Sequence, residues 1–207
     1  MRIKIPKKGF EKLTPAKARL IAHLIGDGSH FLAGGTNYYL RYEVKDEELL
    51  NQFSKDIMLV YGFKTSSSWN PSGFTGELIR SVWIRSKIAF EDMEEYATYF
   101  SKDWFIKSWL FNSSLNIKKE FLRSLYDDEG SVLKEHKRGV IRLYSINEKG
   151  LKQIQELLLH FGIPTIMRSG YGARRNVFAI VTYDLKQFYK KIGFNLTRKQ
   201  ERLKEIL

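Results

Sequence analysis

The sequence contains no cysteine, and this absence excludes a disulfide framework, a thiolate zinc site and a cysteine nucleophile. It also has no run of about 18 apolar residues, so no transmembrane helix is predicted. The first eight residues are charged and lack the apolar segment of a secretion signal. We therefore expect an intracellular protein of the cytoplasm or nucleoid that is not secreted and does not bind a membrane.

Histidine is also scarce, which bears on the kind of enzyme that the chain could be. His23, His30, His136 and His160 are scattered and do not form the His-Asn-His cluster of some metal nucleases. No glycine-rich loop suited to a nucleotide phosphate follows a predicted strand. A histidine-based nuclease and a small-molecule enzyme are therefore both disfavoured.

Positive charge, in contrast, is present in excess. The chain has 35 lysine and arginine residues against 23 aspartate and glutamate, a net charge of +12 in 207 residues. The basic residues are dispersed and alternate with aromatic ones, as in residues 38–42, whereas a membrane-surface helix needs a basic block or face. A nucleic acid is the expected partner, and a solvated basic surface without a partner is the alternative.

Two segments of the chain resemble each other, Leu20–Gly28 and Leu122–Gly130. In each, an apolar helical stretch ends in an acid followed by glycine, Asp27-Gly28 in the first and Glu129-Gly130 in the second. Such a sequence directs the acid beyond the end of its helix. The repetition predicts a duplicated unit with two matched carboxylates.

The order of predicted elements also repeats, as α-β-(β)-α-β-β-α in each half, which indicates a tandem repeat. The first half is read as helices 14–26, 46–61 and 87–100, a strand 38–44 and a hairpin of strands 63–69 and 77–85. The second half is read as helices 116–128, 147–161, 184–192 and 197–207, with strands 140–145, 163–169 and 177–183. Asn116 is the predicted cap of helix 116–128, and residues 104–113 are read as a helical link. We predict an α+β fold of two αββαββα-type halves, residues 1–103 and 116–207, joined by a linker at 104–115.

Small residues line one stripe of the first motif helix. Ala18, Ala22 and Gly26 follow each other at intervals of four, which lets a second helix approach closely. Packing of the two motif helices would bring Asp27 and Glu129 together. Two neighbouring acids at helix C-termini repel each other and the helix dipole, and a divalent cation reverses that repulsion. Such ions can activate water and stabilise both oxygens of an in-line displacement at phosphorus.

The paired segments resemble the two signatures of the LAGLIDADG homing endonuclease family, in the single-chain, two-repeat form of the archaeal intron-encoded type. Residues 121–132 are similar to the family's second block, and residues 150–163 and 192–203 to its closing segments. The resemblance covers about residues 13–207. It implies two antiparallel sheets that form a saddle over a long asymmetric DNA site, and a monomer with pseudo-twofold symmetry.

The resemblance also implies roles for individual residues. Asp27 and Glu129 correspond to the family's metal-binding catalytic acids, and Gly26 and Asp128 to positions that offer backbone carbonyls to the metal. Two or three divalent ions, Mg²⁺ or Mn²⁺, are expected. Lys45 resembles the basic residue that stabilises charge near the scissile phosphate, while the matching position, Ile146, is not basic. Arg142, Lys87 and Lys199 are candidates to supply that charge, and His23 is interpreted as a packing or surface histidine.

Outward positions on the strands are expected to contact double-stranded DNA, because a two-stranded ribbon fits the major groove and arginine pairs with guanine. The hairpin tips are expected to hold flanking phosphates. The predicted DNA-binding residues are Tyr39, Arg41, Glu43, Ser81, Trp83, Arg85, Arg142, Tyr144, Arg168, Arg174 and Arg175.

The predicted function is site-specific, metal-dependent double-strand cleavage of DNA by phosphodiester hydrolysis. Met1 and Leu207 differ from the terminal residues that protein splicing requires, so a free-standing, intron-encoded enzyme is expected. The alternative is an RNA maturase or a non-cleaving DNA-binding protein on the same fold. Such a protein could dispense with the two acids, and this sequence retains both.

Overall fold

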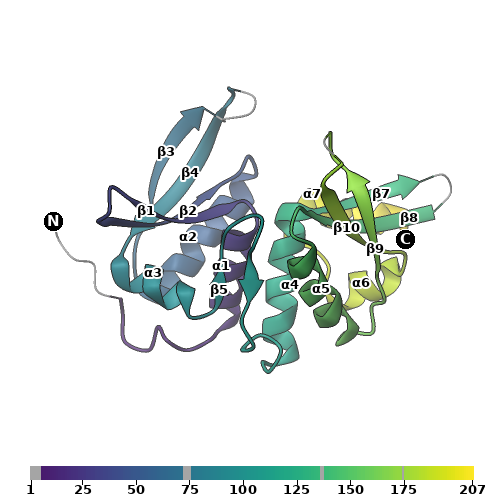
Figure 1. Ribbon diagram of the computed structural model, residues 1–207, viewed down its shortest axis with the longest axis horizontal. Coiled ribbons are helices and arrows are strands. Elements are labelled where there is room, and N and C mark those ends of the chain that lie inside the picture. The colour runs from purple at the N-terminus through teal and green to yellow at the C-terminus, as the bar shows by residue number, and fades with distance from the viewer. Residues whose placement is uncertain (1–5, 72–75, 136–137, 174) are drawn as a thin grey trace.

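The computed structural model shows two similar halves that lie side by side, each with a four-stranded sheet and helices packed against it (Figure 1). It describes residues 6–71, 76–135, 138–173 and 175–207. The first half contains α1–α3 and the second α4–α7, and the two halves meet along α1 and α4. The helices are α1 (Pro15–Ile25), α2 (Glu47–Tyr61), α3 (Lys87–Glu94), α4 (Leu115–Glu129), α5 (Glu148–Leu159), α6 (Leu185–Lys191) and α7 (Thr197–Ile206).

The two main sheets have the same topology, which confirms the predicted α+β tandem repeat. Their strand orders are β1-β2-β4-β3 and β7-β8-β10-β9, and all neighbouring strands are antiparallel. A short ribbon, β5-β6, lies between the halves in sequence. The strands are β1 (Gly28–Ala33), β2 (Asn37–Glu43), β3 (Ser66–Pro71), β4 (Leu78–Arg85), β5 (Ala97–Thr98), β6 (Phe105–Ile106), β7 (Gly130–Glu135), β8 (Arg138–Ser145), β9 (Ile166–Tyr171) and β10 (Val177–Thr182).

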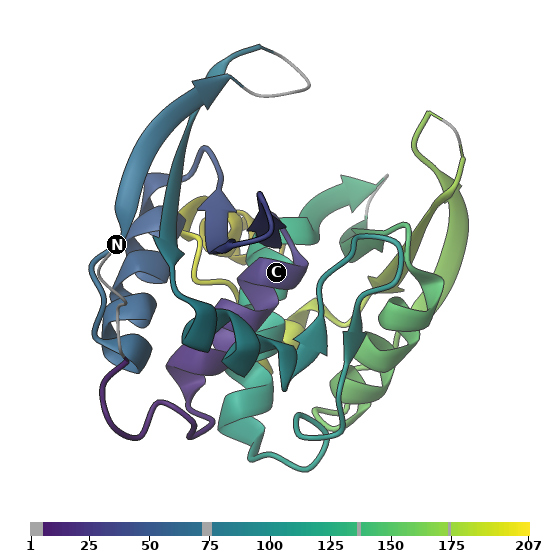
Figure 2. The same ribbon diagram turned by 60° about the vertical axis from the view of Figure 1, so that its left-hand side comes forward.

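Alternation along the central strands separates a helix-facing side from an outer side. In β2, Leu40 and Tyr42 are buried in the main core, whereas Tyr39, Arg41 and Glu43 are half-buried on the other side, as the sequence predicts. The second sheet differs, because Val140, Ala179 and Val181 form a separate buried cluster. The hairpins β3–β4 and β9–β10 rise as two arms on opposite sides of the molecule (Figure 2).

The small-residue stripe of α1 packs against α4, as predicted. Ala18 and Ala22 are completely buried. A Cβ atom on Gly26 would lie 2.5 Å from Oδ2 of Asp128, so only glycine fits at this position. The close approach places the C-terminal ends of α1 and α4 next to each other.

Several predicted boundaries are wrong, among them the starts of strands 63–69 and 163–169, which lie at Ser66 and Ile166. The helix expected over residues 87–100 ends at Glu94, because residues 97–98 pair with residues 105–106 as β5 and β6. The same pairing replaces the predicted helical link over residues 104–113. The cap of α4 is Ser114, whose hydroxyl accepts a hydrogen bond from the Ile117 amide at 3.4 Å, and Asn116 lies inside the helix. In the part of the chain that the structure describes, no helix has both the length and the hydrophobicity needed to span a bilayer.

Candidate active site

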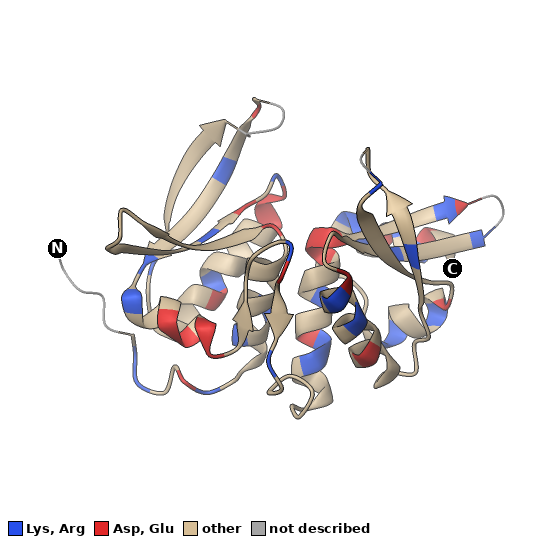
Figure 3. Ribbon diagram, in the orientation of Figure 1, with Lys and Arg blue, Asp and Glu red and all other residues tan. Residues whose placement is uncertain are grey.

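The two predicted acids lie where the motif helices end. Asp27 follows the C-cap of α1, and Glu129 is the last residue of α4. Both helices end beneath the arms, and acidic residues gather at the upper end of α4 (Figure 3). Glycine follows each acid because no side chain fits there: a Cβ at Gly28 would lie 2.5 Å from the His23 carbonyl, and one at Gly130 would lie 2.4 Å from the Tyr126 carbonyl.

The electrostatics of this region disfavour two ionised acids. Burial, with further contributions from the charges of Asp27 and Asp128, raises the pKa of Glu129 to about 8. Burial and the charge of Asp128 raise the pKa of Asp27 to about 6, although Asp27 is exposed on its outer side and water there screens part of the effect. The two carboxylates therefore carry a charge that the surrounding protein does not fully compensate.

This charge imbalance suits a divalent cation, which prefers carboxylate, carbonyl, water and phosphate oxygens. Within the described ranges, no group of three or more histidine, cysteine, aspartate or glutamate side chains forms a complete metal site. Asp27 and Glu129 could thus supply only part of a coordination shell. The backbone carbonyl of Gly26 lies directly before one of these acids and that of Asp128 directly before the other.

The side chain of Asp128 does not join the two acids but turns into the first half. Its Oδ1 accepts a hydrogen bond from the Tyr42 hydroxyl at 2.5 Å, and its two oxygens lie 3.0 and 3.1 Å from Nδ1 of His23. The side chains of Asp128 and His23 are 0% and 1% exposed. Burial alone would lower the pKa of His23, but the charge of Asp128 raises it above its ordinary value. His23 is thus a buried, paired residue.

Lys199 is one of the three basic candidates for the second motif, and it lies next to α4. Its buried Nζ donates to the carbonyls of Asp127 at 2.5 Å, Gly130 at 2.6 Å, Tyr126 at 3.1 Å and Asp128 at 3.3 Å. Burial lowers its pKa. A cation at a helix C-terminus stabilises the unpaired carbonyls and the helix dipole. Lys87 instead pairs with Glu91 on α3, at 3.5 Å.

Lys45, the basic candidate for the first motif, lies just after β2. Its side chain is 65% exposed and pairs with Glu77 near the base of the β3–β4 tip. An exposed pair of this kind contributes little stability and leaves the lysine able to change partner.

The first sheet presents its predicted DNA-binding residues on its outer side, with one exception. Arg41 pairs with Glu43, and Tyr39 stacks on Phe31 with ring centroids 5.0 Å apart. Trp83 is half-buried and Arg85 is exposed. Ser81 corrects the prediction: it is on this side of the sheet but fully buried, because Ser68 and Asn70 bond to its hydroxyl and cover it.

The second sheet holds its predicted DNA-binding residues more tightly. The side chain of Arg142 is only 12% exposed, pairs with Glu135 at 2.5 Å and lies over the Tyr171 ring at 5.3 Å. Tyr144 stacks edge-on against Tyr171 at 5.4 Å. In the part of the chain that the structure covers, Arg168 and Arg175 are exposed at the β9–β10 arm, and Arg174 lies outside the described residues.

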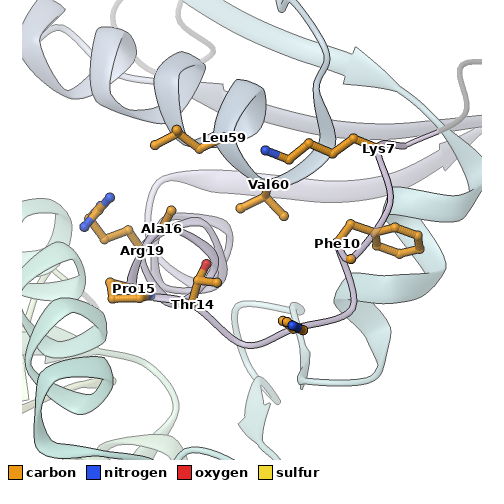
Figure 4. Close-up of a pocket in the computed structure, with 10 residues that line it drawn as sticks. Lys7, Phe10, Thr14, Pro15, Ala16, Arg19, Leu59 and Val60 are labelled. Atoms are coloured by element: carbon orange, nitrogen blue, oxygen red, sulfur yellow. The ribbon is translucent and has the colours of Figure 1, made fainter.

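A cavity of about 440 Å³ lies at the other end of α1, away from the acids (Figure 4). Lys7, Phe10 and Pro15 line it, together with Arg19, whose guanidinium is already paired with Asp56 and Glu120. Since α1 has 11 residues, this cavity is about 15 Å from Asp27 along the helix. It therefore forms no part of the candidate active site.

The sequence analysis missed two residues at the site. The alternation of residues in β2 predicts that Tyr42 is buried in the core. It does not predict the hydrogen bond from the Tyr42 hydroxyl to Asp128. Asp127 is buried at 2% exposure and accepts bonds from the amides of Asn195 and Leu196, both at 3.0 Å. The acid run at residues 127–129 could have indicated that not all three carboxylates serve a metal.

Comparisons with known proteins concern the second half of the chain and the overall fold. Residues 116–193 match the family model of the LAGLIDADG-like domain. Over 90% of its length the chain is 28% identical to the DNA-directed RNA polymerase subunit Rpo1N of Methanocaldococcus jannaschii. The chain spans only between 8% and 20% of the length of the curated relatives that it matches.

The fold resembles solved structures of homing endonucleases along most of the chain. Mesophilic variants of I-DmoI superpose with a TM-score of 0.65 at 15% identity, over 96% of this chain and 100% of theirs. I-WcaI, bound to its DNA recognition sequence, superposes with a TM-score of 0.67 at 14% identity, over 91% of this chain and 87% of its own. I-DmoI has also been solved in complex with DNA and manganese or calcium.

Proposed function

We propose that the protein is a DNA endonuclease, because residues 116–193 match the family model of the LAGLIDADG-like domain and the chain has a fold similar to that of homing endonucleases. It makes a site-specific double-strand break in a long asymmetric target and is encoded by an intron. The observation that carries this proposal is the pair of acids, Asp27 and Glu129, at the adjoining ends of α1 and α4.

The residues at these helix ends fit a divalent cation. Asp27 and Glu129 would hold it with carboxylate oxygens, and the carbonyl of Gly26 would add a backbone ligand. The Asp128 carbonyl is a weaker candidate, because Lys199 already donates to it at 3.3 Å. Two or three Mg²⁺ or Mn²⁺ ions, when bound, would lower the pKa of an attacking water and stabilise charge on the scissile phosphate.

The chain's own residues supply the remaining requirements of phosphodiester hydrolysis. Lys45 is exposed and can turn from Glu77 towards a phosphate. Lys199 holds the last turn of α4, and so Glu129, in one position. Each acid then takes part in the cleavage of one DNA strand, and the two cuts together give the double-strand break. The surroundings of the two acids differ.

DNA lies across the outer sides of the two sheets, between the arms. Tyr39, Arg41 and Glu43 of β2 face the bases of one half-site, and Arg142 and Tyr144 of β8 face those of the other. Arg168, on strand β9, also faces the DNA bases, and Arg175, at the tip of the second arm, contacts flanking phosphates. The net charge of +12 provides the sequence-independent attraction that such a contact needs.

The test is cleavage of DNA that carries the chain's own intron-insertion junction, with Mg²⁺, with Mn²⁺ or with EDTA. We expect linear product with either metal and none with EDTA. Glu91→Gln, which removes an exposed acid on α3 remote from both motifs, is the matched control for acid-to-amide changes. Equal product in EDTA would contradict metal-dependent hydrolysis. Tight binding without cleavage under any condition would favour a maturase or a non-cleaving DNA-binding protein.

A further inference from the structure

Asp128 carries a buried carboxylate close to the two acids, to which the proposed mechanism gives no part. Asp128 belongs to α4 of the second half, yet the groups that contact its side chain belong to the first half. Tyr42 donates from β2 at 2.5 Å, His23 lies on α1 at 3.0 Å, and the Asp27 amide lies 3.5 Å from Oδ2. A buried charge with this many partners fixes the position of the groups around it.

The contact is also steric. The space beside Gly26 is filled by Oδ2, Cβ and Cγ of Asp128, which lie 2.5, 2.8 and 3.0 Å from where a Cβ of residue 26 would be. The absence of a side chain on α1 and the presence of a carboxylate on α4 are therefore complementary. In the described part of the chain, the other ring nitrogen of His23 has no hydrogen-bond partner, so Asp128 alone orients this ring by hydrogen bonding.

Asp27 directly follows Gly26, and Glu129 directly follows Asp128, so this contact joins the two residues that precede the acids. We infer that Asp128 is a positioning residue that, through His23 and Tyr42, holds the first motif's acid at a fixed distance from the second motif's acid. This inference rests on the proposed function, because it assigns the contact to the coupling of two strand cuts. Cleavage of the second strand then follows quickly on cleavage of the first, and little nicked DNA accumulates.

Other contacts between the halves do not replace this one. Arg19 pairs with Glu120 at 2.7 Å near the opposite end of α1, where it keeps the halves joined without fixing their upper ends. Arg198 pairs with Asp46 at 2.8 Å, and the amide and hydroxyl of Thr197 both donate to Glu48 at 2.9 Å, but these groups are exposed and solvent weakens their interactions. Loss of Asp128 should thus loosen the halves near the acids without separating them.

The test compares Asp128→Ala with Asp127→Ala. Alanine at position 128 keeps the backbone carbonyl and removes only the contact between the halves. Asp127 is the matched control, because its carboxylate is equally buried on α4 but bonds to Asn195 and Leu196 of its own half. Tyr42→Phe is a milder variant, which removes the hydroxyl but keeps the ring stacked on Phe53 at 5.0 Å.

We expect Asp128→Ala to raise the ratio of nicked to linear plasmid by about fivefold or more, the lower end of typical coupling between two sites. Tyr42→Phe should raise it less, and Asp127→Ala should lower the melting temperature without changing the ratio. An unchanged ratio in Asp128→Ala would overturn the inference. A ratio that rises in all three variants in proportion to lost stability would overturn it as well.

A second measurement separates this inference from the proposed function. Since the chain has no cysteine, Lys64→Cys in the first half and Lys190→Cys in the second can each carry a spin label on an exposed residue. We expect the distance distribution between the labels to widen with Asp128→Ala and to stay unchanged with Asp127→Ala. If the unaltered protein cleaves no DNA, the nuclease function is wrong, and equal widths would show that Asp128 does not hold the halves.

Discussion

The two motif helices end in the same way in sequence but in different surroundings. In the first, Gly26 precedes Asp27, which is exposed. In the second, Asp128 precedes a half-buried Glu129, and Lys199 lies on the last carbonyls of the helix. A repeated fold therefore does not imply two equal sites, because equivalent positions carry different residues and because Lys199, beside the second acid, comes from a part of the chain that is not repeated. Among the described elements, α7 has no counterpart in the first half.

The side chains on the outer sides of the two sheets also differ. On the first sheet, polar residues cover one another, and Arg41 is half-buried beside Glu43. On the second, Val140, Ala179 and Val181 form a buried cluster beneath Tyr144 and its neighbours. In the proposed complex, sheet topology would set where each half meets DNA, and these side chains would set what each half distinguishes. We therefore expect the target to be asymmetric.

The largest expected effect comes from replacing the acid at the end of either motif helix. Asp27→Asn or Glu129→Gln should each reduce double-strand cleavage by roughly 10²-fold or more, because each removes an anionic metal ligand. Binding should be unchanged or tighter, since repulsion between acid and phosphate is lost. Strand-specific products on denaturing gels check this, and wild-type rates in both variants would remove these residues from the mechanism.

The next effect tests Lys199, which only the second motif has. Lys199→Met should lower the free energy of unfolding by roughly 1–3 kcal/mol, because buried carbonyls lose a charged donor. For a chain of this size that corresponds to a fall in melting temperature of about 2–4 °C per kcal/mol. The strand served by Glu129 should be cut more slowly than the other. Equal slowing of both strands would mean that Lys199 acts on the fold and not on one site.

A pH titration of the metal-free protein compares the acids directly. The pKa of Glu129 is raised from 4.5 to about 8, and that of Asp27 from 3.8 to about 6. Between the lower and upper value of each pair, the folded chain holds protons that the unfolded chain has released, so stability falls as pH rises. Between pH 5 and pH 8.5 we expect a loss on the order of 1–2 kcal/mol, well below the full shifts because solvent reaches the exposed Asp27 and also the half-buried Glu129.

Two comparisons complete that titration, and both use thermal unfolding curves. Glu129→Gln should flatten the pH dependence more than Asp27→Asn, because the pKa of Glu129 is displaced further. Mg²⁺ should raise the melting temperature more at pH 8.5 than at pH 5. A melting temperature that is independent of pH in the unaltered protein would contradict the assignment of both shifts.

The repeat could be predicted from the sequence because it depends on periodic patterns. Burial of alternate residues in β2 and the end of α2 at residue 61 follow from local rules, and the C-cap Gly62 has a φ of +74°, as expected for a left-handed C-terminal residue. Residues 95–106 could not be predicted, because a two-residue ribbon forms only when Ala97 and Ile106 are buried by the rest of the chain.

Part of the candidate site could likewise be predicted from the sequence, and part could not. Asp27 and Glu129 are visible in the sequence because a duplicated acid-glycine pair marks two helix ends. The partners of Asp128 could not be predicted, because His23 and Tyr42 lie far from it in sequence and their types do not indicate a bond. Ser81 was misplaced because alternation gives the side of the sheet but not what covers a residue there.

Replacing an arginine that contacts bases should have a smaller effect than the changes above. The effect should also differ between the two halves. Arg41→Ala should cost roughly 1–3 kcal/mol at a few base pairs of one half-site, because arginine contacts guanine edges in the major groove. Arg142→Ala should affect the other half-site, and less strongly, because Arg142 must first leave Glu135 and the Tyr171 ring. Glu135→Gln should accordingly tighten binding. Selection from a randomised duplex library gives the base-preference profile, and an unchanged profile for Arg41→Ala would contradict this reading surface.

The smallest effect is expected at the tip of the second arm, where we propose contacts to phosphates. Arg175 is exposed beside Gly172 and has a φ of +52°, so its position is set by a turn and not by packing against the sheet. Arg175→Ala should weaken binding to all sequences about equally and lower the slope of log affinity against log salt by roughly one, the release expected for one phosphate contact. Binding is measured over a salt series with a selected duplex and with an unrelated one. A loss confined to the selected duplex would mean that Arg175 reads bases, and that the second arm shares in recognition with β8.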